Sequence, residues 1–288
     1  MAYDELAKKI DAFKTLAQSI NFAWPRNAPV ASQMQLVEEF LADVKASPEQ
    51  ALTKWTAKDF LQWYRAIIAV EMLCDSAVAL KDLPAALLKK QLELSSMTDL
   101  SQDFEQSQSK EYLYELQIGA TVHRSGFQIQ FAEPDLRISG NGLSQELGIA
   151  CKYVSSEKKL NSNISKGYEQ IAGQGLKGIV AVGIDNVAAA GMNRFIQFPD
   201  DPNRIRAGMA NELRKWIEKT IKTRAGTSGR APLDGAMFTL RMVGIAGNPK
   251  GLLPATHVSF QVTKENPIRK DIERIASEFA RAHGVGLE

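Results

Sequence analysis

Three polar residues in the middle of the chain are of the types that bind a divalent cation or activate water. Asp135 directly follows Pro134 at the start of a predicted strand, and Lys152 lies near the end of the next apolar strand. A lysine in such an apolar segment is costly unless it is paired or faces a cleft. Glu115 lies in the preceding predicted helix, from which it can project toward the same edge. We therefore expect Glu115, Asp135 and Lys152 to meet in one solvent-open pocket.

The predicted strands that carry Asp135 and Lys152 are joined by a tight turn. Strand patterns cover 127–131, 135–139 and 147–154, and the Asn141–Gly142 pair between the last two is a strong hairpin signal. Strands joined in this way pair antiparallel. We therefore expect Asp135 and Lys152 to lie near one end of the hairpin, on the same face.

The rest of the chain divides into a helical first part and a mixed second part. Apolar residues at helical spacing predict helices over 4–20, 32–44, 57–80 and 83–94, and one that begins at about 104 or 110 and ends at 124. Thr56 is the predicted N-cap of the third of these helices. The later segments predict, in order, a helix over 160–171, a strand over 178–185, a basic helix over 203–223, strands over 237–245 and 257–262, and a helix over 267–283.

The expected fold class is α/β, with an all-helical N-terminal lobe over 1–100 and a second domain over 101–288. Within about 104–185, the order of predicted elements is helix, three strands, helix and strand. The segments YE, SGFQIQF, EPDLRI, LGIACKY and YEQI follow one another along this stretch. This set resembles the PD-(D/E)XK nuclease superfamily, whose restriction-endonuclease-like core has the order αβββαβ. The resemblance implies such a core with C-terminal strand and helix additions.

The family resemblance also implies a function and roles for individual residues. It implies a metal-dependent nuclease of bacterial or mobile-element type that hydrolyses phosphodiester bonds in DNA, with RNA less favoured. Asp135 would be the central ligand of Mg²⁺ (or Mn²⁺), and Glu115 would contribute directly or through water. Lys152 would orient or deprotonate the attacking water and stabilise the transition state. Gln170, or neighbouring Glu169, would hold a water or a phosphate.

One position departs from the family pattern, because Ala150 stands where the second acidic residue belongs, two positions before Lys152. Residues two apart in a strand share a face, so a carboxylate is missing beside the lysine. Glu115 or Glu133 would then supply the ligand, or the site is degenerate and binds nucleic acid without cutting it. A further alternative is that position 150 carries a substitution of a natural acidic residue.

Positive charge is concentrated in one segment of the chain. Residues 201–250 contain ten Lys and Arg against four Asp and Glu, whereas the whole chain has a net charge of +2. A local basic stretch is typical of a phosphate-backbone contact, although a solvated helix face gives the same pattern. The residues that we expect to contact nucleic acid are Arg204, Arg206, Arg214, Lys215, Lys219, Lys222, Arg224 and Arg230.

Composition and short motifs narrow the remaining function classes. The 288 residues are 44% hydrophobic and 24% charged, which is ordinary globular composition, and two cysteines are too few for a disulfide framework. No apolar leader or membrane-length apolar stretch is visible, so we expect a soluble, cytoplasmic protein without a membrane contact. The motif G-x-G-x-x-G at 173–178 follows a helix and opens a strand, the reverse of a dinucleotide site.

Two other functions remain open from the sequence. The first is a catalytically inactive module on the nuclease fold that binds nucleic acid, which Ala150 favours. The second is a protein-interaction module, which the acidic helical lobe favours. A homodimer or a complex with a protein partner is compatible with either function.

Overall fold

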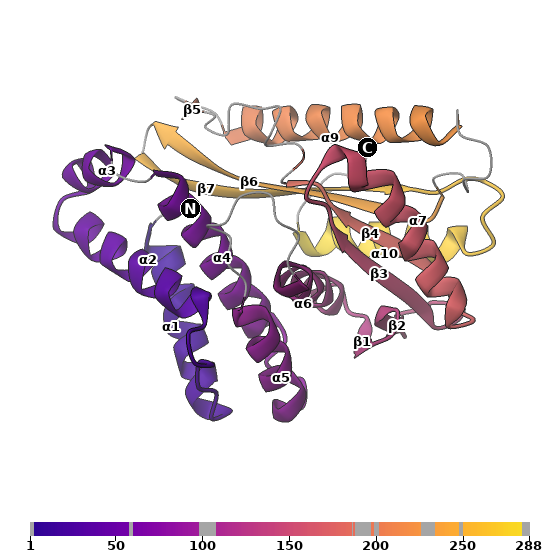
Figure 1. The fold of residues 1–288 in the computed structure, drawn as a ribbon, viewed down its shortest axis with the longest axis horizontal. Coiled ribbons are helices and arrows are strands. Elements are labelled where there is room, and N and C mark those ends of the chain that lie inside the picture. Colours follow the sequence, from indigo (N-terminus) through magenta and orange to yellow (C-terminus); the bar gives the residue numbers. More distant parts are fainter. Residues whose placement is uncertain are drawn as a thin grey trace.

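The structure is a computed structural model, and it describes most of the 288 residues. The described residues are 3–57, 60–97, 108–185, 187, 197–198, 202–225, 234–247 and 250–283. They form an α/β protein in which helices of the first part pack beside a mixed sheet (Figure 1). The division into domains at 100/101 remains a prediction.

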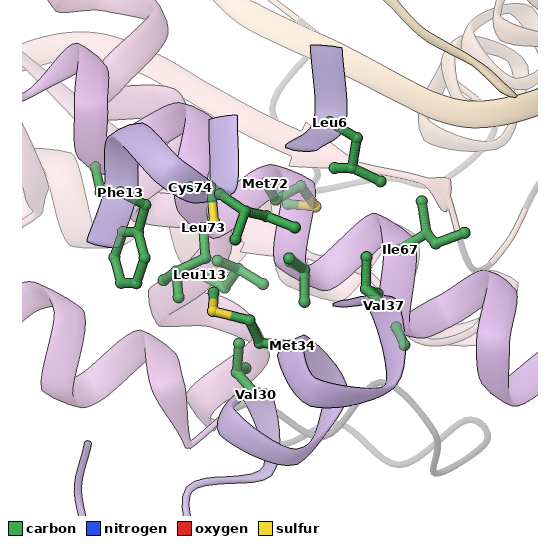
Figure 2. Packing of buried hydrophobic residues seen from close by; sticks show 14 of the residues in the cluster. Leu6, Phe13, Val30, Met34, Val37, Ile67, Met72, Leu73, Cys74 and Leu113 are labelled. Atoms are coloured by element: carbon green, nitrogen blue, oxygen red, sulfur yellow. The ribbon is translucent and has the colours of Figure 1, made fainter. Parts of the chain in front are cut away.

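In the described residues of the N-terminal part, the secondary-structure elements are all helices, as predicted. Its helices are α1 (Tyr3–Ser19), α2 (Pro29–Ala46), α3 (Pro48–Ala57), α4 (Phe60–Ala79) and α5 (Ala85–Ser96). Leu6, Ile10 and Phe13 recur at helical spacing on α1 and are buried, which explains why this segment forms a helix against its neighbours. Figure 2 shows Phe13 gathered with Met34 of α2 and other apolar side chains in the core of the lobe.

The second part begins with α6 (Gln108–Arg124) and contains one mixed sheet. Its strands are β1 (Gln128–Ala132), β2 (Asp135–Ser139), β3 (Leu147–Tyr153), β4 (Lys177–Gly183), β5 (Gln197–Phe198), β6 (Ala236–Gly247) and β7 (Lys250–Gln261). The strand order is β1-β2-β3-β4-β6-β5, and β7 pairs with β6. The hairpin β1–β2 and the pair β2–β3 are antiparallel, whereas β3, β4 and β6 are parallel. The predicted antiparallel pairing of the strands that carry Asp135 and Lys152 is confirmed.

Helices cover both faces of the sheet, because side chains of the central strands alternate between two apolar clusters. On one face, Ala150 and Val180 pack under α7 (Glu157–Gly173) and α9 (Pro202–Ala225). On the other face, Cys151 and Ala181 pack under α6 and α10 (Arg269–His283). The central strands are therefore buried on both sides, which accounts for their nearly unbroken apolar sequences.

Helix α6 connects the helical lobe to the sheet. Its Leu113 and Leu116 belong to the lobe core, whereas Tyr114 and Ile118 belong to the cluster under the sheet. Because residues at these positions are all buried, α6 has apolar contacts on two sides. This double packing fixes the helix that carries Glu115.

A chain of ion pairs also joins the lobe to the sheet. Arg241 on β6 pairs with Glu71 on α4, and their side chains are only 8% and 4% exposed. Nζ of Lys9 on α1 lies 2.6 Å from Oε1 of Glu71 and 3.0 Å from Oδ1 of Asp75. Nη1 of Arg124 on α6 lies 2.6 Å from Oδ2 of Asp75. The network therefore links α1, α4, α6 and β6, elements that are far apart in sequence.

Four details of the element prediction were wrong, and the first is that no separate helix was predicted where α3 lies. Thr56 lies inside α3 (Pro48–Ala57) and does not cap the next helix, α4 (Phe60–Ala79). The short strand β5 lies between the segments predicted as a strand over 178–185 and a helix over 203–223, where no element was predicted, and it pairs with the distal end of β6. Strand β7 begins at Lys250, seven residues earlier than expected, because the long partner β6 offers pairing along its whole length.

Candidate active site

Asp135 is held at the edge of the sheet by its position at the start of β2. The register pairs Leu136 with Ile149, so one residue further along Asp135 lies opposite Ala150. The backbone N–H of Cys151 donates a hydrogen bond to Oδ2 of Asp135 at 2.6 Å. Main-chain pairing and this hydrogen bond therefore fix the carboxylate at the same sheet edge as the end of β3.

Lys152 reaches the carboxylate of Asp135, as the sequence predicted. Its Nζ atom lies 3.6 Å from Oδ2 of Asp135, and the two side chains are 15% and 14% exposed. The lysine is thus paired rather than isolated in its apolar strand, and both groups keep a limited opening to solvent. The expectation that the two side chains share one face of the hairpin is confirmed.

Gln170 on α7 is the polar centre of this group. Its Oε1 accepts a hydrogen bond from Nζ of Lys152 at 2.8 Å. Its Nε2 donates to Oδ1 of Asp135 at 3.0 Å, to Oε2 of Glu133 at 3.1 Å, and to the carbonyl oxygen of Pro134. The structure thus brings Gln170 to the site, whereas Glu169 is exposed to solvent.

Glu115 is coupled to the same group electrostatically. Burial, followed by the negative charges of Asp135 and Glu111, raises its pKa to about 8, and the charge of Lys152 opposes that shift. Burial also raises the pKa of Asp135, against the charge of Lys152 and the hydrogen bonds from Cys151 and Gln170. Glu115 is thus a largely buried carboxylate close to the negative charge of Asp135, an environment that favours a cation.

The side chain at position 150 is the methyl group of Ala150, so this strand position supplies no carboxylate to the site. The residue is fully buried and packs with Val180 and Leu160 in the cluster under α7. Glu133, one of the sequence alternatives, is bonded by Gln170 and raises the pKa of Asp135. Across the part of the chain that the structure describes, no group of three or more His, Cys, Asp and Glu side chains is placed to hold a metal ion.

A second polar group, which was not predicted from the sequence, lies at the same edge of the sheet. Asp185, which follows β4, accepts hydrogen bonds from the side chain of Tyr153 and from the backbone N–H of Arg241, the latter at 2.6 Å. Burial raises the pKa of Asp185 to about 7. The signal in the sequence was an acidic residue directly after an apolar strand. Parallel strands end at the same edge of a sheet, so such a residue lies near the end of the neighbouring strand.

The predicted basic residues separate into three groups in the structure. Arg214, Lys215, Lys219 and Lys222 are exposed on α9, as a phosphate contact requires. Arg204 and Arg206 lie in α9 with side chains outside the described part, and Arg230 lies outside the described residues.

Arg224 requires a correction. It is 2% exposed, and its Nη1 donates to the carbonyl oxygen of Asn161 at 3.2 Å and to Oγ of Ser165 at 3.3 Å. Its guanidinium also lies 5.9 Å from the ring centroid of Tyr168. The charge therefore joins α9 to α7 inside the protein, and we withdraw its assignment to a nucleic-acid contact.

Comparisons with protein-family models, with curated proteins and with solved structures found no match to this chain.

Within the described helices, none combines the length and the apolar character needed to cross a lipid bilayer.

Proposed function

We propose that the protein is a metal-dependent nuclease with a restriction-endonuclease-like core, and that it hydrolyses phosphodiester bonds in DNA. The observation that carries the proposal is the contact of Asp135, Lys152 and Gln170 at one sheet edge. These residues come from two strands and a helix. The order α6, β1, β2, β3, α7, β4 around them is also the order of the proposed core.

The donor chemistry of the site fits Mg²⁺ or Mn²⁺. Magnesium is usually held by one or two carboxylates, with waters and substrate phosphates completing its shell, so three protein ligands are not required. Asp135 and Glu115 would hold the ion, and Glu133 would add negative charge beside them. The bound ion would polarise the phosphate and offset developing negative charge.

Side chains of the protein itself would orient the attacking water and stabilise the negative charge of the phosphate. Lys152 places an ammonium group beside Asp135, where it can orient an attacking water and stabilise negative charge on phosphate oxygens. Gln170 fixes the lysine and the aspartate through its two amide atoms, so neither needs to reorganise during the reaction. The exposed cations of α9 would contact the phosphate backbone without reading sequence.

Digestion of plasmid and single-stranded DNA with Mg²⁺ or Mn²⁺ tests the proposal. The wild-type chain is expected to cut in a metal-dependent way, and Asp135→Ala and Lys152→Ala are each expected to lower the rate by at least about 100-fold. Asp82→Ala, which removes an exposed carboxylate beyond α4, is the matched control and should cut like the wild type. Full activity of both site variants would reject the proposed site.

A second candidate function is a nuclease-fold module that binds DNA without cutting it. The specific observation in its favour is the buried methyl group of Ala150 directly beside the site. This alternative predicts salt-sensitive DNA binding and no cleavage with any divalent metal. Cleavage that appears only in Ala150→Glu would identify the wild type as the inactive form.

A further inference from the structure

Helix α7 carries a row of exposed polar side chains that ends at the proposed active site. Lys159, Ser162 and Lys166 are exposed, and Gln170 follows Lys166 by four residues. Residues three or four apart lie on one side of a helix, because an α-helix has about 3.6 residues per turn. We call Lys159, Ser162, Lys166 and Gln170 the α7 row.

The orientation of the α7 row is fixed by the packing of the opposite side of the helix. Leu160, Ile164 and Ile171 are buried against the sheet. At Gly167, a Cβ atom would lie 2.7 Å from a methyl carbon of Val180, so the helix backbone approaches β4 too closely to allow a side chain. The orientation of the helix is therefore fixed: Lys159, Ser162 and Lys166 are exposed to solvent, and Gln170 contacts Lys152 and Asp135 at the end of the row.

The α7 row begins beside the basic face of α9. Lys219 on α9 lies 2.5 Å from Glu157 in the first turn of α7, which offsets the negative charge nearest to Lys159. The buried Arg224 binds Asn161 and Ser165 and so holds the two helices together. Figure 1 shows both helices on the same side of the sheet.

We infer that the phosphate backbone of DNA follows the α7 row from the basic face of α9 to the active site, with Lys159 and Lys166 as phosphate contacts. This inference rests on the proposed function. From Lys159 to Gln170 the helix rises about 16 Å at 1.5 Å per residue. One DNA strand presents a phosphate about every 3.4 Å along the duplex axis, so the row has the length of several phosphates.

The test compares the salt dependence of DNA binding in two variants of equal net charge. Lys159→Gln/Lys166→Gln removes the cations of the row, and Lys8→Gln/Lys90→Gln removes two exposed lysines of the helical lobe. A fluorescein-labelled DNA duplex is titrated in Ca²⁺ buffer over a series of NaCl concentrations, with fluorescence anisotropy as the readout. Circular dichroism checks that both variants are folded.

The row variant is expected to bind more weakly and to lower the slope of log K against log salt by about 2, since each phosphate contact contributes about 0.9. The lobe variant should keep the wild-type slope. Equal slopes in all three proteins, or an equal loss in the two variants, would overturn the inference.

The same experiment separates this inference from the nuclease proposal. DNA cleavage by the wild type, together with an unchanged slope in the row variant, would support the nuclease proposal and overturn the proposed phosphate contacts of the α7 row. A reduced slope in the row variant, with no cleavage by the wild type in any metal, would support the α7 row as a DNA-binding surface and overturn the nuclease proposal. Absence of DNA binding by the wild type would overturn both.

Discussion

At the scale of single residues, Gln170 accounts for the geometry of the site better than any charged group. A glutamine amide has an acceptor and two donors, so one side chain can bond an ammonium group and carboxylates at once. Here its oxygen accepts from Lys152 and its nitrogen donates to Asp135 and Glu133. Removing it would leave the lysine and the acids in place without the link that orients them.

We therefore expect Gln170→Ala to lower kcat for DNA cleavage by about 10- to 100-fold, the usual cost of losing a partner that orients a ligand or a catalytic group. The KM for DNA should change little, because the exposed cations of α9 are untouched. Glu169→Ala is the matched control, since Glu169 is the exposed neighbour. A larger loss in the Glu169 variant than in the Gln170 variant would contradict the role of the amide.

Asp185 gives a prediction about stability and pH. Burial raises its pKa from 3.8 to about 7, so the folded protein binds a proton that the unfolded chain has released between these values. Stability from this group is present below about pH 4 and is lost as the pH rises to about 7.

The Asp185→Asn variant has no ionisable group at position 185. As the pH rises from about 4 to about 7, its free energy of unfolding should therefore increase relative to that of the wild type. Urea unfolding at a series of pH values measures the difference. A difference between the two proteins that is constant with pH would show that Asp185 does not titrate as described.

The positions of Asp135 and Lys152 in the site were predictable from the sequence. Asp135 and Lys152 were identifiable because strand alternation and a tight turn determine which side chains share a face, and the register then sets their separation. Asp185 and Tyr153 were not identifiable in this way, because their contact depends on the parallel pairing of β3 and β4, for which the sequence gives no register.

At the scale of elements, the contact between α7 and α9 determines where the basic residues point. From the sequence, Arg224 was grouped with the other basic residues on charge alone, one position beyond the predicted helix over 203–223, whereas α9 extends to Ala225. The period of the helix places Met209, Leu213, Ile217, Thr220 and Arg224 on its buried side. Charge alone therefore misassigned Arg224, and the apolar spacing of the preceding residues was the signal that it faces inward.

Arg224→Ala should lower the free energy of unfolding by about 2 kcal/mol, because it leaves partly buried acceptors on α7 without their donor. Arg214→Ala removes an exposed arginine from the same helix, and its effect should stay within about 0.5 kcal/mol. Urea denaturation measures both. Equal effects of the two substitutions would mean that the contact between the helices contributes nothing to stability.

The glycines of the G-x-G-x-x-G motif also find their explanation at this scale. Gly175 has a φ of +66° in the turn after α7, a conformation that favours glycine. Gly178 pairs with Gly148 in the parallel ladder, where an added Cβ would collide with the Gly148 carbonyl. The prediction of a turn that ends a helix and opens a strand is confirmed.

At the scale of the whole molecule, the helical lobe and the sheet are joined by buried charge as well as by α6. Glu71 accepts from both Arg241 and Lys9, and its side chain is 4% exposed. The sequence indicates no partner for Glu71, because Arg241 lies 170 residues away and no local pattern connects them. A pairing of this kind is decided by the packing of the lobe on the sheet.

Glu71→Gln should lower the free energy of unfolding by about 3 kcal/mol, since it leaves the buried Arg241 charge without its counterion. Glu38→Gln is the matched control, because Glu38 pairs with Lys14 at the surface and its loss should cost less than about 1 kcal/mol. Guanidinium denaturation, followed by circular dichroism, measures both variants. Similar small losses would show that the network does not hold the lobe to the sheet.

The central claim, that Asp135 and Glu115 form a site for a divalent cation, is tested most directly by an anomalous difference map from crystals soaked in Mn²⁺. We expect a manganese peak next to the carboxylates of these two residues in the wild type, and its loss in Asp135→Ala. A map from fully soaked crystals with no peak at this edge of the sheet would contradict it.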